Sequence, residues 1–217
     1  RSVAKPFPAM NRREFLIKTG AATAGCVLGG LSTARTASAA TQPAMGSPGV
    51  AIVCDPGDPI VATGPAKWAA EQLRQALTQR GVAAKICAGL GEVNPADLCV
   101  VATGGASAMA RDGGLAVPAE AEALAIAAGR LGQRDVLLVG GRDVRGLVYA
   151  LTELADAVAH GNDPAVVLRP TQAVTERPAN AVRSVMRMVT SKVEDKPWFT
   201  DRDFWRSYLS LLVTQRF

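Results

Sequence analysis

The helix expected over residues 143–159 constrains the fold of this chain more than any other feature. Its apolar residues recur at every third or fourth position: Val144, Leu147, Val148, Leu151, Leu154, Ala155 and Val158. That spacing gathers them on one face of an α-helix, and such a face has to pack against another apolar surface. A strand expected at 135–139 (DVLLV) comes just before the helix. A strand followed closely by an amphipathic helix favours a layered α/β fold.

The residues before this unit alternate between strands and helices in the same way. We expect strands at 50–54, 82–88, 97–102 and 165–169, and a helix at 66–80 that is stopped by Gly81. Residues 121–127 and 135–139 are separated by so short a stretch that an antiparallel hairpin is favoured over a crossover. The predicted fold class is therefore α/β, with a small mixed sheet and helices packed on it.

Residues 10–39 have the pattern of an export signal, with a basic start, an apolar stretch and small residues ending in Ala37-Ser38-Ala39. Within it, Arg12, Arg13, Phe15 and Leu16 resemble the twin-arginine signal, although Asn11 stands where that signal has Ser or Thr. The apolar stretch is short and rich in Gly, so it is a poor membrane span. We expect the twin-arginine export machinery as a partner, a periplasmic or secreted location, and no stable membrane span after cleavage. An amphipathic N-terminal helix and a lipoprotein site at Cys26 are the alternatives.

The net positive charge of the chain comes from the leader, residues 1–39, which include the expected export signal. The chain has 24 Lys and Arg against 19 Asp and Glu, a formal net charge of +5. Residues 1–39 hold six of the basic residues and one acidic residue, which leaves the rest of the chain balanced. A balanced remainder has no bulk charge for binding nucleic acid or an anionic membrane, so neither is expected as a partner.

Few residues outside the leader suggest chemistry. The turn Gly140-Gly141-Arg142-Asp143-Val144-Arg145-Gly146 lies between a strand and a helix, where a dinucleotide site is found, but its glycines are not spaced as G-x-G-x-x-G. Its other interpretation is a tight turn that lets the helix pack close to the sheet. Cys54, Cys87 and Cys99 fall on expected strands, and their spacing is not that of metal ligands. The only histidine, His160, is expected to cap a helix end, so no cofactor and no metal site is predicted.

A resemblance extends this interpretation. Residues 122–158 resemble the hairpin and helix that end the small α/β domain before the catalytic barrel of family 20 β-N-acetylhexosaminidases, and also the N-terminal domain of α-glucuronidases. The shared pattern is carried by Glu122, Ala123, Ile126, Val139, Gly140, Gly146, Tyr149, Ala150 and Leu154. Ala150 departs from the usual Gly, and Ala123-Leu124 from the usual aromatic residue.

The resemblance implies that a (β/α)8 barrel begins after the α/β domain. Residues 178–187 look like its first strand, 188–199 like its first loop, and 200–217 like its first helix, capped by Thr200 and ending early in an incomplete barrel. By position in the family, Arg183 is a candidate for binding substrate, and Glu194 and Asp195 lie on the loop at the active-site face. No catalytic residue is assigned, because the two carboxyl groups that glycoside hydrolysis needs come from later barrel strands in these families.

The predicted organisation therefore has five parts: 1–9 as upstream read-through or added sequence, 10–39 as the signal peptide, 40–49 as a linker, 50–175 as the accessory α/β domain and 176–217 as the start of a barrel. The first hypothesis for function is the N-terminal part of an exported glycoside hydrolase acting on an oligo- or polysaccharide, with this fragment inactive alone. A self-contained periplasmic binding or interaction module is the alternative, and it requires the last helix to pack back onto the α/β domain. A nucleotide-dependent oxidoreductase fragment is the third hypothesis.

Overall fold

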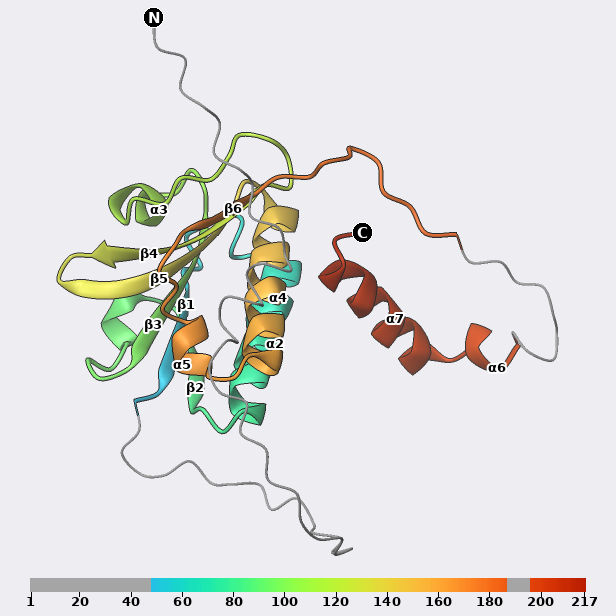
Figure 1. Cartoon of the computed structure of the whole chain (residues 1–217), viewed down its shortest axis with the longest axis horizontal. Coiled ribbons are helices and arrows are strands. Elements are labelled where there is room, and N and C mark those ends of the chain that lie inside the picture. Colours follow the sequence, from blue (N-terminus) through green and yellow to red (C-terminus); the bar gives the residue numbers. More distant parts are fainter. Residues whose placement is uncertain (1–47, 187–195) are drawn as a thin grey trace, which may run out of the picture.

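A computed structural model describes residues 48–186 and 196–217 (Figure 1). Its centre is a six-stranded sheet with the strand order β2-β1-β3-β5-β4-β6. The strands are β1 (Val50–Cys54), β2 (Ala84–Cys87), β3 (Leu98–Gly104), β4 (Leu124–Leu131), β5 (Arg134–Gly141) and β6 (Val174–Glu176). The helices are α2 (Gly64–Gln79), η1 (Leu90–Glu92), α3 (Ala108–Asp112), α4 (Val144–His160), α5 (Pro164–Val167), α6 (Lys196–Phe199) and α7 (Arg202–Thr214). The predicted α/β class with a mixed sheet is confirmed.

Five strands of the sheet run in one direction and β4 alone runs in the other. β2, β1, β3 and β5 run parallel, whereas β4 pairs antiparallel with both β5 and β6. The hairpin of β4 and β5 is the one expected from the short connection, and Gly132 supplies its turn at a φ of +61°. The central parallel strands read as continuous apolar runs because both of their faces are covered.

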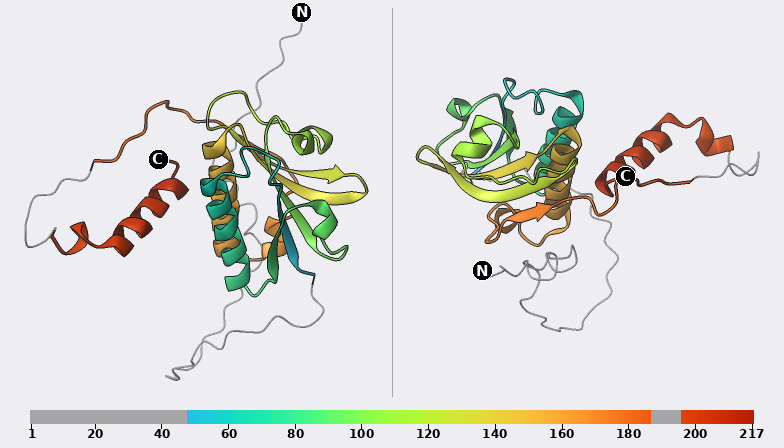
Figure 2. Two further views of the ribbon diagram at one scale, coloured as in Figure 1. Left: turned by 180° about the vertical axis from the view of Figure 1, so that it is seen from behind. Right: turned by 90° about the horizontal axis from the view of Figure 1, so that it is seen from above.

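Helices α2 and α4 lie side by side on one face of the sheet (Figures 1 and 2). Each begins at a side-chain cap, because Thr63 Oγ1 accepts from Ala66 N and Asp143 Oδ1 accepts from Gly146 N. Leu73 of α2 and Leu151 of α4 are fully buried against the sheet. The opposite face is covered by shorter elements, chiefly η1, α3 and the loop that carries Leu115.

The prediction of a strand at 165–169 is wrong. Residues 165–167 belong to helix α5, and a turn follows the helix. Pro164 occupies the first helical position, and the Asp163 side chain accepts from Ala165 N at 2.8 Å. These are the start signals of a helix. The last strand is instead β6, which places the expected domain boundary at 175/176 inside a strand.

The C-terminal segment also differs from expectation. Residues 178–186 form neither strand nor helix, and none of the strand pairs in the described ranges includes them, so the expected first barrel strand is not formed there. A strand needs a neighbouring strand for its backbone hydrogen bonds. The pairing with β4 ends at Glu176 of β6, before residues 178–186 begin. The expected last helix is confirmed as α7, but its cap is Asp201 and not Thr200, since Asp201 Oδ1 accepts from Asp203 N and Phe204 N.

Candidate functional site

Arg183 lies against the α/β domain, in a charged cluster with Glu122, Arg145 and Tyr149. Strand pairing explains the meeting, since Leu124 of β4 is opposite Glu176 of β6, so residues just before β4 adjoin those just after β6. A guanidinium N–H of Arg183 donates to Glu122 Oε2, and the Arg183 guanidinium lies 5.8 Å from the centre of the Tyr149 ring. The Arg183 side chain is 23% exposed.

Glu122 is held firmly in this cluster. Its backbone N–H donates to Asp143 Oδ2 at 2.9 Å, and its Oε1 accepts from Arg145 Nη1 at 2.7 Å. Asp143 uses its other oxygen to cap α4. One half-buried carboxylate therefore receives two guanidinium groups. Within the described ranges, Nε and Nη1 of Arg183 make no hydrogen bond, so the side chain retains donors for a sugar hydroxyl or a carboxylate.

The other two residues predicted to bind substrate cannot be placed beside Arg183. Glu194 and Asp195 lie outside the described residues, as do Arg12, Arg13, Phe15 and Leu16 of the expected export signal. The role of Arg183 in substrate binding and the roles of these residues stay predictions.

The glycine-rich turn after β5 has a packing role. A Cβ on Gly141 would lie 1.9 Å from Leu147 N, and a Cβ on Gly146 would lie 2.2 Å from Ala123 O. Both positions therefore exclude any side chain. The N–H of Gly146 and that of Leu147 already donate to Asp143. With these two amides occupied and its glycines explained by contact, the turn fits the close-packing interpretation.

A cavity of about 410 Å³ lies at the carboxyl ends of β1 and β3. The connections from these two neighbouring strands leave in opposite directions, which is where open α/β sheets bind ligands. Its polar lining is engaged within the protein: buried Asp58 accepts from Ile60 N, Val61 N and Gly104 N, and Thr103 bonds with Ser107. These contacts hold the loop after β1 against the end of β3.

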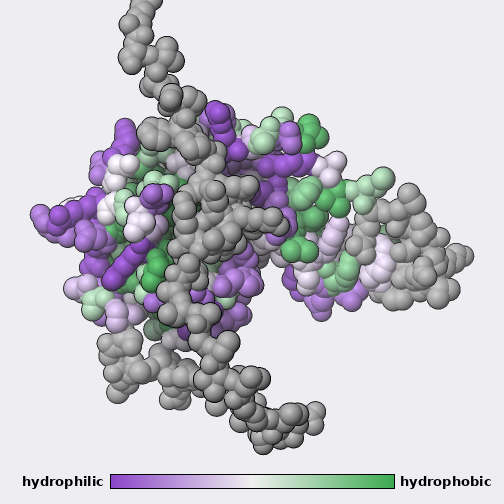
Figure 3. All heavy atoms as spheres, in the orientation of Figure 1, coloured by the Kyte–Doolittle hydropathy of each residue, from purple (hydrophilic) through white to green (hydrophobic). Residues whose placement is uncertain are grey.

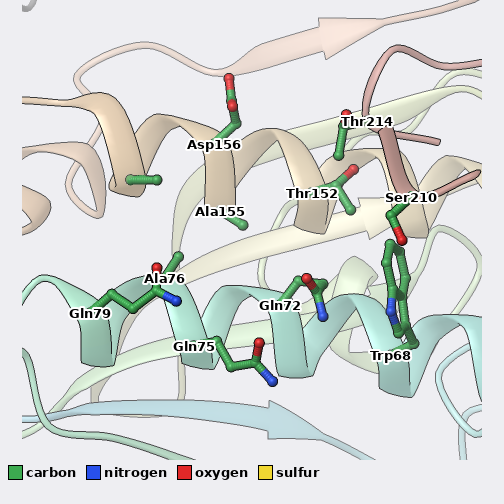
Figure 4. Close-up of a pocket in the computed structure, with 11 residues that line it drawn as sticks. Trp68, Gln72, Gln75, Ala76, Gln79, Thr152, Ala155, Asp156, Ser210 and Thr214 are labelled. Atoms are coloured by element: carbon green, nitrogen blue, oxygen red, sulfur yellow. The ribbon is translucent and has the colours of Figure 1, made fainter. Parts of the chain in front are cut away.

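A second hollow separates α7 from the helix pair. Its volume is about 200 Å³, and Figure 4 shows Ser210 and Thr214 of α7 facing Trp68 of α2 and Thr152 of α4. Gln72, Gln75 and Gln79 supply much of its polar lining. The hollow shows that the C-terminal end of α7 approaches the α/β domain without closing fully onto it.

The remaining sequence candidates have ordinary structural roles. Burial raises the pKa of Cys54 and of Cys99 to about 11, so both are neutral thiols at neutral pH. Both cysteines and Cys87 are free. His160 ends α4 with Nδ1 3.0 Å from Asp156 O, as expected of a terminal cap. Across residues 48–186 and 196–217, no three His, Cys, Asp or Glu side chains are placed to hold a metal ion, and no helix is long and apolar enough to span a membrane.

Comparison with known proteins gives a likeness of fold. No family model matches the chain, and no curated protein matches it. Among solved structures, it is similar to a GH138 enzyme targeting pectin rhamnogalacturonan II, with a TM-score of 0.53 and 20% identity. The match covers 78% of this chain and 23% of that one. A weaker match is a family GH115 4-O-methyl-α-glucuronidase with specificity for decorated arabinogalactans, at a TM-score of 0.37 and 21% identity over 60% of this chain and 16% of that one.

The chain therefore shares the fold of part of a glycoside hydrolase and spans less than a quarter of the length of the GH138 enzyme. The weaker match is too distant to support an argument. Sequence reasoning found Arg183 but missed its partners, because Glu122 is 61 residues away and meets it only through the pairing of β4 with β6. Glu122 is the first residue of the pattern shared with the glycoside hydrolases, and this was the one signal in the sequence that marked it.

Proposed function

We propose that this chain is the N-terminal part of an exported glycoside hydrolase, whose intact form hydrolyses O-glycosyl bonds of an oligo- or polysaccharide. The observation that carries the proposal is the fold shared with a GH138 enzyme over 78% of the chain. In this proposal, residues 48–176 form an accessory α/β domain and residues 177–217 lead into the catalytic region. The pattern of residues 122–158 supports a relation to family 20 β-N-acetylhexosaminidases as part of this proposal.

The surface of α7 supports the proposal. Leu209 and Leu211 are each 55% exposed, and no residue of α7 is buried. Figure 3 shows hydrophobic side chains at the surface of this helix. The rings of Trp198, Phe204, Trp205 and Tyr208 contact one another with centres 5.4–6.0 Å apart. An apolar helix face of this kind is typical of a helix that packs against further structure, such as a barrel.

The proposal includes no catalytic residue in this chain. Glycoside hydrolysis needs two carboxyl groups that flank the scissile bond. Asp55 and Asp58 share a cavity, but Asp58 is fixed by three backbone N–H groups as part of the loop. In the intact parent, Arg183, Glu194 and Asp195 would border the substrate, and the reacting carboxylates would come from other barrel strands.

The test compares this chain with the longer protein read from the same gene. Both are purified and assayed with aryl glycosides, including N-acetylglucosaminide and glucuronide, and with plant oligosaccharides. We expect turnover by the longer protein and none by residues 40–217. Turnover by residues 40–217 alone, or a reading frame that encodes no further domain, would each overturn the proposal.

Export is tested separately, with residues 10–39 fused to a folded fluorescent reporter in a bacterium with twin-arginine machinery. The proposal expects fluorescence outside the cytoplasm, lost when Arg12 and Arg13 are both replaced by Lys. A matched variant with Lys18→Arg should be exported normally. Export that continues in the double variant would contradict the twin-arginine proposal but leave the hydrolase proposal standing.

One observation favours the alternative of a self-contained binding module. The C-terminal end of α7 does approach the α/β domain, where Val213 packs against the core beside α4. In a self-contained module this contact would extend along the whole helix, so the purified chain would be a monodisperse monomer that binds no hydrophobic dye. Strong dye binding or self-association that Leu209→Ser and Leu211→Ser relieve would favour the hydrolase fragment instead.

A further inference from the structure

Two arginines attach the C-terminal segment to the α/β domain, one near each end of the segment. Arg183 lies in the cluster with Glu122 described above. Arg216, just after α7, has a second set of partners: its Nη2 donates to Glu153 Oε2 at 3.0 Å, and its Nη1 donates to Glu176 Oε2. This second cluster joins the end of α7 to α4 and to β6.

The side chains that attach the segment are largely shielded from solvent, whereas Arg145 of the first cluster is 71% exposed. Side-chain exposure is 23% for Arg216, 16% for Glu153 and 29% for Glu176, and it is 23% for Arg183 and 14% for Glu122. Burial lowers the pKa of Arg216, but its bonds to Glu176 and Glu153 outweigh this and raise the pKa overall. Ion pairs in such surroundings are weakly screened by salt and are costly to break on one side only.

Other ion pairs of the same segment are different in kind. Arg177 pairs with Glu120 at side-chain exposures of 70% and 47%, and Arg206 pairs with Asp203 at 78% and 89%. Exposed pairs of this type contribute little to stability. They therefore serve as matched controls for Arg183 and Arg216.

Each cluster also contains a residue with an unusual backbone conformation. In the part of the chain that the structure describes, the non-glycine residues with positive φ are Glu122, at 62°, and Arg216, at 63°. A left-handed conformation is unfavourable for such residues; at Arg216 it closes the end of α7, where Phe217 N donates to Leu212 O. One strained residue thus lies in each cluster, and in each case it contributes the side chain that makes two ion pairs.

We propose that Arg183 and Arg216 form a two-point clamp that fixes the C-terminal segment, with its helix α7, on the α/β domain. The first point sets where the chain leaves the sheet, and the second sets where α7 ends. The clamp does not rest on the proposed function.

The test is hydrogen exchange measured by mass spectrometry on the 217-residue chain and on Arg183→Gln, Arg216→Gln and the double variant. We expect Arg216→Gln to speed exchange of α7 amides roughly tenfold or more, because bonds to charged groups are lost. Arg183→Gln should speed exchange in β6, which pairs with the start of β4 next to Glu122. The double variant should fall short of the product of the two single effects, because each point holds the other close to its partners and each single variant already loses that support.

The control variants are Arg177→Gln and Arg206→Gln, which should leave exchange unchanged. Amides of β1, β3 and β5 should also be unchanged in every variant. A uniform rise that includes β3 would assign the arginines to general stability and overturn the clamp. So would an unchanged α7 in Arg216→Gln, or an α7 that is already unprotected in the parent chain.

A glycine variant separates the ion pairs from the strained backbone. Glycine accepts a positive φ, so Arg216→Gly removes the strain together with both ion pairs. If the clamp is right, α7 exchanges faster in this variant; slower exchange would show that relief of strain outweighs the ion pairs, and would overturn it. A double variant that swaps the two charges, Arg216→Glu with Glu153→Arg, should recover part of the protection of the α7 amides. If the single variants acted only by disturbing side-chain packing, the swap would recover none.

Discussion

Helices α4 and α7 have similar sequence patterns and different surroundings. Both have an Asp cap and a clear apolar face. Most residues of α4 are buried against the sheet and the neighbouring α2, whereas no residue of α7 is buried. An apolar face therefore predicts that a helix needs a partner, but it does not say whether the partner is present within the same domain.

The largest contrast is expected between leucines of these two helices. Leu151→Ala in α4 removes a fully buried side chain and should cost about 2–5 kcal/mol of unfolding free energy. Leu211→Ala in α7, where the side chain is 55% exposed, should cost less than about 1 kcal/mol. Urea unfolding followed by far-ultraviolet circular dichroism measures both. Equal losses would mean that α7 belongs to the same cooperative unit as the sheet.

The glycines give the next contrast. Gly146→Ala places a Cβ 2.2 Å from Ala123 O, which should cost about 1–3 kcal/mol or more because the backbone has to shift. Gly91→Ala meets no atom within 4 Å and should change stability by less than about 1 kcal/mol. Thermal unfolding of the two variants distinguishes them. A Gly146→Ala protein as stable as the parent would refute the packing role of the turn.

The two capping aspartates should differ in how far their effect reaches. Asp143→Ala removes acceptors for Gly146 N and Glu122 N and should lower global stability by about 1–2 kcal/mol. Asp201→Ala removes acceptors for Asp203 N and Phe204 N and should fray the start of α7 without moving the main transition. Amide exchange resolved by segment reports both effects. A global loss in Asp201→Ala would contradict the separation of the two regions.

The smallest contrast concerns two exposed ion pairs, one in each region. Hydrogen bonds from Arg74 and Gln75 lower the pKa of Glu71 to about 2. Because the folded pKa lies below the unfolded value, the stabilisation is fully present above about pH 4.5 and declines as pH falls toward 2. The pair is exposed, so the contribution should stay below about 1 kcal/mol.

Glu71→Gln should therefore reduce stability slightly at pH 7, and the difference from the parent should narrow by pH 2.5. Asp203→Asn removes the similar i, i+3 pair of α7 and should leave the main transition unchanged at both pH values. Unfolding midpoints in urea provide the measurement. A difference that grows as the pH falls would reverse the assigned sign.

Local pattern was enough to predict most of the α/β domain. The strand at Val50–Cys54 has the expected bounds, and the hairpin and the helix after it were readable from spacing alone. Helix α5 was missed although Asp163-Pro164 is a start signal, because the apolar run after it also suits a strand. The expected barrel strand failed for a different reason, since a strand depends on a neighbour that the local sequence does not specify.

The candidate site was less predictable than the fold. Arg183 was chosen by its position in a family pattern, but its bond to Glu122 depends on strand pairing between distant segments. The pairing of Arg216 with Glu153 and Glu176 is equally non-local, and no motif announces it. Charged residues in loops look alike in sequence, and only the fold separates those that are buried in pairs from those in solvent.

The position of β6 also has a consequence for synthesis on the ribosome. β6 is the last strand of the sheet in chain order, and it completes the edge by pairing with residues 124–126 of β4. Every strand and both large helices of the domain are therefore translated before α7 emerges from the exit tunnel. Domains fold as units during translation, so the sheet can form first and present Glu122, Glu153 and Glu176 as a finished surface to the arriving segment.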